Sequence, residues 1–92
     1  MDVWNSKAKR LLKSELVKRG ISNIDLAFLL RNIGIDETKS SLDSKISRGT
    51  FSASFFLQCM TAIGCTKIDI EEFKITNLKV AELKESYIVE KV

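Results

Sequence analysis

The 92-residue sequence contains no histidine and no proline, and it has only two cysteines, one tryptophan and one tyrosine. A structural zinc site needs four ligands, and a chain without histidine or a second cysteine pair does not supply them. The sequence also lacks a phosphate-cradling glycine loop and a glycine-flanked nucleophile, which mark two common kinds of catalytic site. We therefore expect a protein that is not an enzyme and that holds no metal ion and no cofactor.

Long apolar runs are absent as well. No stretch approaches the roughly 20 apolar residues that cross a bilayer. The N-terminus is polar and lysine-rich, unlike the apolar region of a secretion signal. We expect a cytoplasmic protein without membrane contact, in which Cys59 and Cys65 are reduced, structural thiols.

Positive charge is concentrated in the first half of the chain, although the net charge is only +3. Residues 1–50 hold ten Lys and Arg against six Asp and Glu, whereas residues 51–92 hold five Lys against six acids. The densest block contains Lys7, Lys9, Arg10, Lys13, Lys18 and Arg19, opposed only by Glu15. One basic side suits a polyanionic partner such as nucleic acid. The alternative is a solvated helix face, which lysines commonly decorate.

Apolar residues recur at helical spacing, and the chain is 45% hydrophobic and 29% charged. We predict an all-α fold, a compact bundle of four to five helices. The first four predicted helices span residues 2–19 or 3–19, 23–32, 36–48 and 53–63. The first has an apolar stripe of Trp4, Ala8, Leu11, Leu12 and Leu16. The second is apolar nearly all round, so we expect it to be buried on several sides.

Glu15 projects toward the apolar stripe of the first helix. An unpaired buried carboxylate is costly, so Glu15 should have a partner. We expect this partner to be an arginine, either Arg31 or Arg48.

The third helix combines a narrow apolar edge with a broad polar face. Leu42 and Ile46 are its strong apolar positions, and Asp36 is its expected N-cap. Its serines are Ser40, Ser41, Ser44 and Ser47. Serine is a poor helix former, whereas short hydroxyls allow close approach and can bond to phosphates or base edges. The alternative is a neutral, exposed helix.

The hinge after the third helix has strong local signals. Gly49 can enter the left-handed region at low cost, and Ser52 can cap the fourth helix. Phe51 before this cap and Phe56 after it have the spacing of a hydrophobic staple.

The C-terminal part has weaker signals. We assign residues 1–66 to one domain and residues 67–92 to an extension that packs on this core or, as a homodimer contact, on a second copy. A fifth helix is predicted at residues 69–74 or 77–86, and residues 87–89 have the composition of a strand.

The second, third and fourth predicted helices contain residues that match a known helix-turn-helix pattern. The second helix begins with Asp25-Leu26-Ala27, the next turn is Ile33-Gly34, and the third helix ends with Lys45-Ile46-Ser47-Arg48-Gly49. Together with the stretch from Leu57 to Gly64 in the fourth helix, this order resembles the lambda-repressor-like helix-turn-helix class. The motif K-I-S-R-G-T-F-S, which starts at Lys45, also resembles a family of small bacterial and phage domains without an assigned function.

Two features depart from the lambda-repressor-like pattern. The stretch from Gly34 to Leu42 is longer than usual and contains the acids Asp36 and Glu37, and Ser47 replaces the favoured glutamate. These differences change how the third helix would enter a groove.

The resemblance implies binding of double-stranded DNA, with helix 36–48 in the major groove. Base edges and nearby phosphates would face Ser40, Ser41, Ser44 and Lys45. Phosphates would be held by Lys39 and Arg48, with further attraction from Lys9, Arg10 and Lys13. The alternative is a non-catalytic protein-interaction module built on the same scaffold, since fold does not imply function. RNA is less favoured, because no aromatic residue is placed on an exposed sheet or loop for base stacking.

Overall fold

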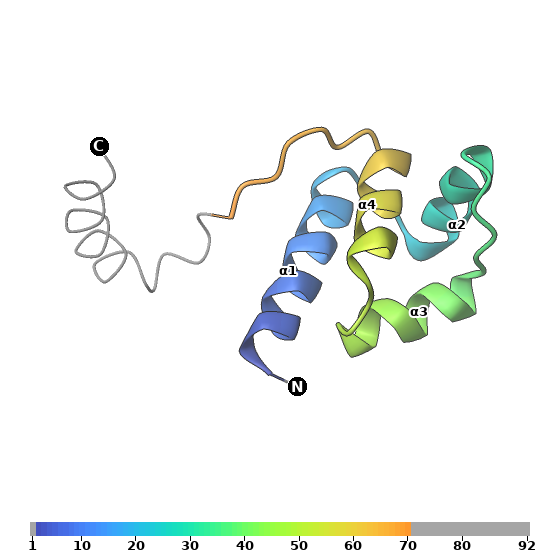
Figure 1. Ribbon diagram of the computed structural model, residues 1–92. Helices are drawn as coiled ribbons and strands as arrows, with labels where there is room; N and C mark the ends of the chain where they lie inside the picture. The colour runs from blue at the N-terminus through green and yellow to red at the C-terminus, as the bar shows by residue number, and fades with distance from the viewer. Residues whose placement is uncertain (1, 71–92) are drawn as a thin grey trace, which may run out of the picture.

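The computed structural model describes residues 2–70, and this range forms four α-helices without a strand (Figure 1). They are α1 (Val3–Lys18), α2 (Asn23–Asn32), α3 (Lys39–Arg48) and α4 (Ala53–Ala62). The all-α prediction is confirmed. The fifth helix and the strand were predicted on residues outside this range, apart from Asp69 and Ile70, which are not helical.

A side-chain cap begins each helix. Asp2, Ser22 and Ser52 cap α1, α2 and α4, and Ser52 is the cap that the sequence predicted for α4. The expected cap of α3 was wrong, because Thr38 and not Asp36 fills this position. The Thr38 hydroxyl accepts from the Ser41 backbone N–H at 3.0 Å, and the Ser41 hydroxyl accepts from the Thr38 N–H at 2.9 Å. This reciprocal capping box satisfies two amides, so it defines the start of the helix better than Asp36 does.

The hinge between α3 and α4 follows the sequence prediction. Gly49 adopts φ 70°, in the left-handed region that glycine enters without a Cβ clash. The Ser52 hydroxyl accepts from the Phe55 N–H at 3.0 Å, and the rings of Phe51 and Phe56 stack with centroids 6.2 Å apart. The predicted cap and staple are therefore confirmed, and together they fix the direction in which α4 leaves α3.

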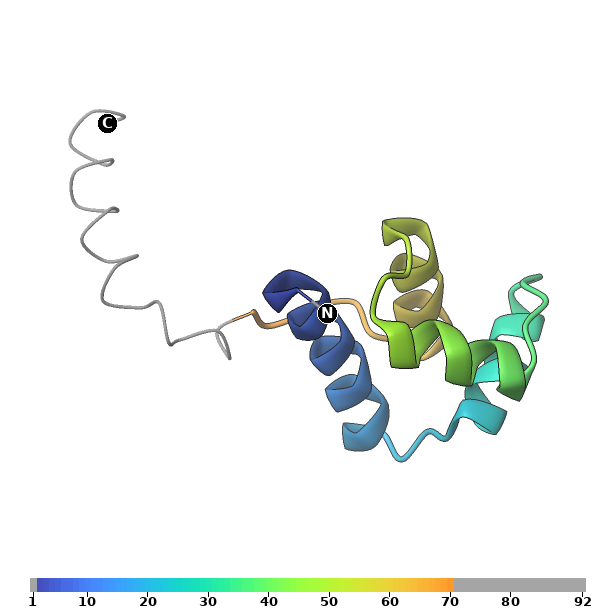
Figure 2. The same ribbon diagram turned by 90° about the horizontal axis from the view of Figure 1, so that it is seen from below.

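The hydrophobic core draws on all four helices. Figures 1 and 2 show the helices wrapped around one centre, with α2 packed against both α3 and α4, and α1 packed against α3. The core consists of Leu12, Leu16, Leu26, Leu30, Leu42, Ile46, Phe55, Cys59, Met60 and Cys65. Leu42 and Ile46 are buried as predicted, so α3 is held by one narrow edge and leaves its other sides to solvent.

Trp4 is the exception in the predicted stripe of α1. Leu11, Leu12 and Leu16 are buried and Ala8 is half-buried, but Trp4 is 72% exposed. Trp4 lies only about 20° around α1 from the buried Leu11, but two turns closer to the N-terminus. The helix spacing was right, but packing covers the level of Leu11 and leaves the first turn of α1 exposed.

The prediction that α2 is buried on several sides was wrong. Only Leu26 and Leu30 are fully buried, whereas Ile24 and Phe28 are more than 60% exposed. Helix α2 packs mainly against α3 and α4, and its outer side, with Ile24 and Phe28, faces solvent.

Glu15 is buried as expected, but its partners are not Arg31 and Arg48. Within α1, its carboxylate accepts from the Lys18 ammonium at 3.1 Å and from the Arg19 guanidinium. These residues follow Glu15 by three and four positions, so they reach it along the helix surface. The Lys18 hydrogen bond is the main reason why the pKa of Glu15 lies below its usual value; burial opposes this effect and Arg19 adds to it.

Both cysteines are free and buried, as predicted. Burial, with a smaller effect from the Glu37 charge, raises the pKa of the Cys59 thiol to about 12. The Cys65 thiol lies 3.1 Å from the Lys67 carbonyl and 3.8 Å from the Glu15 carboxylate, so it ties residues 65–67 to α1.

Candidate nucleic-acid interface

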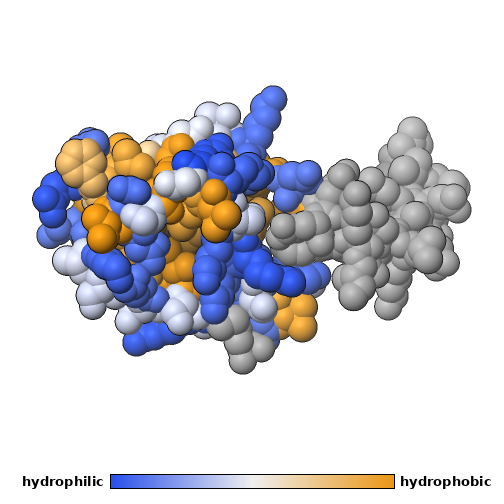
Figure 3. Space-filling view, turned by 180° about the vertical axis from the view of Figure 1, so that it is seen from behind, coloured by the Kyte–Doolittle hydropathy of each residue, from blue (hydrophilic) through white to orange (hydrophobic). Residues whose placement is uncertain are grey.

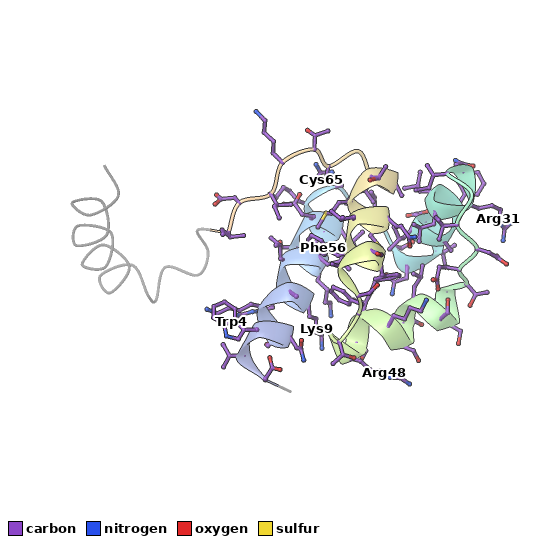
Figure 4. All side chains as sticks on the ribbon, viewed as in Figure 1. Trp4, Lys9, Arg31, Arg48, Phe56 and Cys65 are labelled. Atoms are coloured by element: carbon purple, nitrogen blue, oxygen red, sulfur yellow. The ribbon has the colours of Figure 1, made fainter. Side chains whose placement is uncertain are left out.

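The basic side of α1 lies next to the C-terminal end of α3. The Lys9 ammonium donates to the Ser47 backbone carbonyl at 3.0 Å, although the two residues are 38 positions apart. Figure 4 shows Lys9 between α1 and the end of α3 that carries Arg48. Arg10 and Lys13 continue the same side of α1 and line a shallow hollow with Lys9. The structure therefore joins the predicted α1 residues to α3.

A groove of about 320 Å³ runs between α1, the start of α2 and α3. Lys9 and Lys13 line it from α1, Asn23 from α2, and Asp43 and Ser47 from α3. Its polar lining therefore comes from three helices, which only the folded chain brings together.

The serines of α3 fall into two groups. Ser40 and Ser44 are exposed and make no hydrogen bond through their side chains within residues 2–70, so their hydroxyls can meet a partner. Ser41 differs, because its hydroxyl serves the capping box and lies 2.6 Å from the Glu37 carboxylate. The structure thus separates Ser41, a residue of the helix start, from the two outward-facing serines.

Asp43 is a groove residue that the sequence reasoning missed. Its carboxylate accepts from the Asn23 side chain at 2.7 Å and from the Lys39 ammonium at 2.6 Å. The Asn23 bond first, and then Lys39, hold the pKa of Asp43 below its usual value, so this carboxylate is charged at neutral pH. The four-residue spacing from Lys39 to Asp43 was a readable signal for this ion pair.

Lys45 is also paired with an acid. Its ammonium lies 2.5 Å from the Glu37 carboxylate and 5.2 Å from the centre of the Phe55 ring. Burial alone would raise the pKa of Glu37, but hydrogen bonds from Lys45 and Ser41 bring it below the usual value. Lys39 and Lys45 therefore each have a neighbouring negative charge.

Arg48, in contrast, forms no ion pair within the described residues, and neither do Arg10 and Lys13. All three side chains belong to exposed residues. On the side that α1 and α3 share, the positive charge without an acid partner thus lies on α1 and at the end of α3, while acids offset it near the start of α3. Of the nine predicted residues, only Ser41 has a hydroxyl engaged in holding the helix start.

The described part of the chain shows no cluster of three or more acidic or cysteine side chains suited to a metal ion. None of its helices has the length and apolar character needed to span a membrane.

A family model described as Domain of unknown function (DUF6471) matches residues 4–68. The chain belongs to this family. The match covers α1 from Trp4 onward and all of α2, α3 and α4, and it ends one residue after the segment of residues 65–67 that Cys65 ties to α1. No curated protein and no solved structure matches the chain. The division into a domain of residues 1–66 and an extension of residues 67–92 stays a prediction.

Proposed function

We propose that this protein is a non-enzymatic, double-stranded DNA-binding protein, in which α2 and α3 act as a lambda-repressor-like helix-turn-helix. The observation that carries the proposal is the bond from the Lys9 ammonium to the Ser47 carbonyl. It joins the basic side of α1 to the exposed side of α3, so one surface combines positive charge with short hydroxyls.

Phosphates are bound by the cations of this surface that have no acid partner in the described structure. Arg10 and Lys13 on α1 and Arg48 at the end of α3 hold backbone phosphates, and Lys9 adds attraction between them. These contacts position the protein on the duplex and are independent of sequence.

The outward face of α3 enters the major groove and contacts the base edges. Ser40 and Ser44 are one turn apart and face away from the buried edge of Leu42 and Ile46. Their hydroxyls can donate to or accept from base edges. Lys39 and Lys45 keep their acid partners or exchange them for phosphates, which lowers their net contribution to affinity.

Fluorescence anisotropy on a mixed duplex pool, measured over a salt series, tests this proposal. If Arg10, Lys13 and Arg48 each neutralise one phosphate, log affinity falls with log salt at a slope of about −2.7. Lys13→Glu and Arg48→Glu should each weaken binding and reduce the magnitude of the slope by about 0.9.

Arg31→Glu is the matched control. It makes the same charge change at an exposed arginine at the far end of α2, away from the proposed surface (Figure 4). If Arg31→Glu and Arg48→Glu weaken duplex binding equally, the loss of affinity reflects the net charge of the protein alone, and the assigned surface is wrong.

A second candidate function is a protein-interaction module, which the exposed apolar side chains of α2 favour. Ile24 and Phe28 are 62% and 63% exposed and lie four residues apart, on one face of the helix. Figure 3 shows apolar residues gathered over α2 and α4 on the face seen from behind. Large exposed apolar patches mark contact sites for proteins. Absence of duplex binding even at low salt would make this candidate the leading one.

A further inference from the structure

A second surface of α1 faces away from the proposed DNA-binding side. Trp4 and Lys13 are nine residues apart, which places them about half a turn out of phase around the helix. On the Trp4 side, α1 and α4 line an apolar groove of about 240 Å³. Its lining consists of Trp4, Lys7, Ala8, Leu11 and Phe56. Trp4, the lining residue nearest the N-terminus, is 72% exposed, so the described chain leaves this open end of the groove uncovered.

The chain leaves the four-helix bundle on this same side of α1. Glu15 follows Leu11 by four residues and therefore continues the same side of the helix. The Cys65 thiol lies 3.8 Å from the Glu15 carboxylate, so the segment after α4 crosses α1 at that level. Figure 1 shows residues 65–70 passing over α1 and ending on its outer side, and Figure 4 shows Trp4 on that side as well.

We propose that the segment of residues 71–92 of the same chain packs its apolar side chains into the groove between Trp4 and Phe56. Three apolar residues follow within eight positions of Ile70, namely Phe73, Ile75 and Leu78. Ile70, the last residue that the structure describes, is 60% exposed, so the chain already presents an apolar side chain to solvent at this point.

The length of the segment is sufficient for this contact. Glu15 and Trp4 are eleven residues apart, or about 16 Å along the helix axis. An extended chain covers about 3.3 Å per residue, so eight residues reach about 26 Å. The apolar residues nearest to Ile70 can therefore extend from the level of Glu15 to the open end of the groove.

The tether favours the same chain over a second copy. A segment joined by a short linker acts at an effective concentration of about 1 mM or more, which exceeds the concentration of separate chains in solution. The groove is therefore filled from within the molecule before another chain can compete.

Trp4 is the only tryptophan in the protein, so its fluorescence reports on the groove directly. The test compares acrylamide quenching and the emission maximum of the full chain with those of a triple variant, Phe73→Asp, Ile75→Asp and Leu78→Asp. A matched control places three aspartates at polar positions of the same segment, Thr76→Asp, Asn77→Asp and Ser86→Asp. Light scattering on the same samples gives the mass, and circular dichroism checks that residues 2–70 keep their helices.

We expect Trp4 to be protected from acrylamide in the native chain and in the control, at a mass of one chain. In the apolar-to-aspartate variant, quenching at least doubles and the emission shifts to longer wavelength. Equal quenching of Trp4 in the native chain and the triple variant would overturn the proposal. If Trp4 is protected only in samples whose mass corresponds to two chains, the groove is filled by a second copy, and the proposal is wrong. If the control variant also loses protection, the added negative charge and not the loss of apolar side chains explains the change, and the proposal is wrong as well. DNA binding does not enter this readout, so the two proposals fail independently.

Discussion

Replacing Glu15 by glutamine tests how the ion pairs of α1 stabilise the fold. The Glu15 side chain is 7% exposed and accepts from Lys18 and Arg19, whose side chains are 67% and 31% exposed. Glutamine keeps the shape of the side chain but removes its charge. It also turns an NH2 group toward two donors, so one hydrogen bond is lost and the other is weakened.

The partners of Glu15 determine the size of the effect. Breaking a fully buried ion pair costs about 3–5 kcal/mol, whereas exposed pairs contribute about 0–1 kcal/mol. The buried Glu15 has exposed partners, so we expect the free energy of unfolding to fall by about 1–2 kcal/mol at pH 7. In a domain of this size, each 1 kcal/mol lowers Tm by about 4–8 °C.

The effect should depend on pH. The pKa of Glu15 in the folded state is lowered below 4.5, chiefly by the Lys18 hydrogen bond. A group with a depressed pKa stabilises the fold fully above its unfolded pKa, and this stabilisation is lost as pH falls through its folded pKa. The stability difference between the native chain and Glu15→Gln should therefore be constant from pH 7 to about pH 5 and shrink in more acidic solution.

Urea unfolding followed by circular dichroism at several pH values measures this difference. Asp36→Asn serves as the control, because it removes one negative charge from an exposed residue without a hydrogen bond or ion pair in the described structure. Its midpoint should match that of the native chain. The reasoning is refuted if Glu15→Gln unfolds at the native midpoint at pH 7, or if its deficit persists unchanged below pH 4.

Substitution or labelling of Cys59, Ser52 and Asp43 tests three further features of the structure. The pKa of Cys59 is raised to about 12 by burial, so a thiol reagent at pH 8 should modify Cys59 only in urea, and rapid labelling of the folded protein would contradict this burial. Ser52→Ala removes the cap of α4 and should lower the free energy of unfolding by about 1 kcal/mol, whereas Ser54→Ala, at an exposed position in the same helix, should change it by less than about 0.5 kcal/mol in the same denaturation assay. Asp43→Asn removes a negative charge from the proposed interface and should tighten duplex binding at low salt by about threefold, as for one unit charge about 7 Å from a phosphate in water; unchanged anisotropy curves would place Asp43 outside the interface.

The candidate site was only partly readable from the sequence. Lys9, Arg10 and Lys13 could be assigned to one side of a helix, because residues three and four apart share a face. Their position beside Ser47 could not be read, since it depends on the packing of α1 against α3. Asp43 had a local signal in its spacing from Lys39, but its bond to Asn23 of α2 did not.

The caps of α3 and α4 depend on contacts within a few residues of the chain. Gly49 and Ser52 were predicted correctly, because a left-handed turn and a hydroxyl cap depend only on neighbouring backbone atoms. At the start of α3, Asp36 and Thr38 were both acceptable caps by residue type. Thr38 is the N-cap because its hydroxyl and backbone N–H form reciprocal hydrogen bonds with Ser41.

Helix positions and helix ends were determined by the chain itself, because the period of 3.6 residues and the caps act over a few residues. Exposure was decided by the tertiary structure. Trp4 and Phe28 lie on regular helices of the expected kind, yet both face solvent because no helix among residues 2–70 packs over them. Glu15 has its charged partners three and four residues away, whereas its contact with Cys65, fifty residues along the chain, exists only because the folded chain returns to α1.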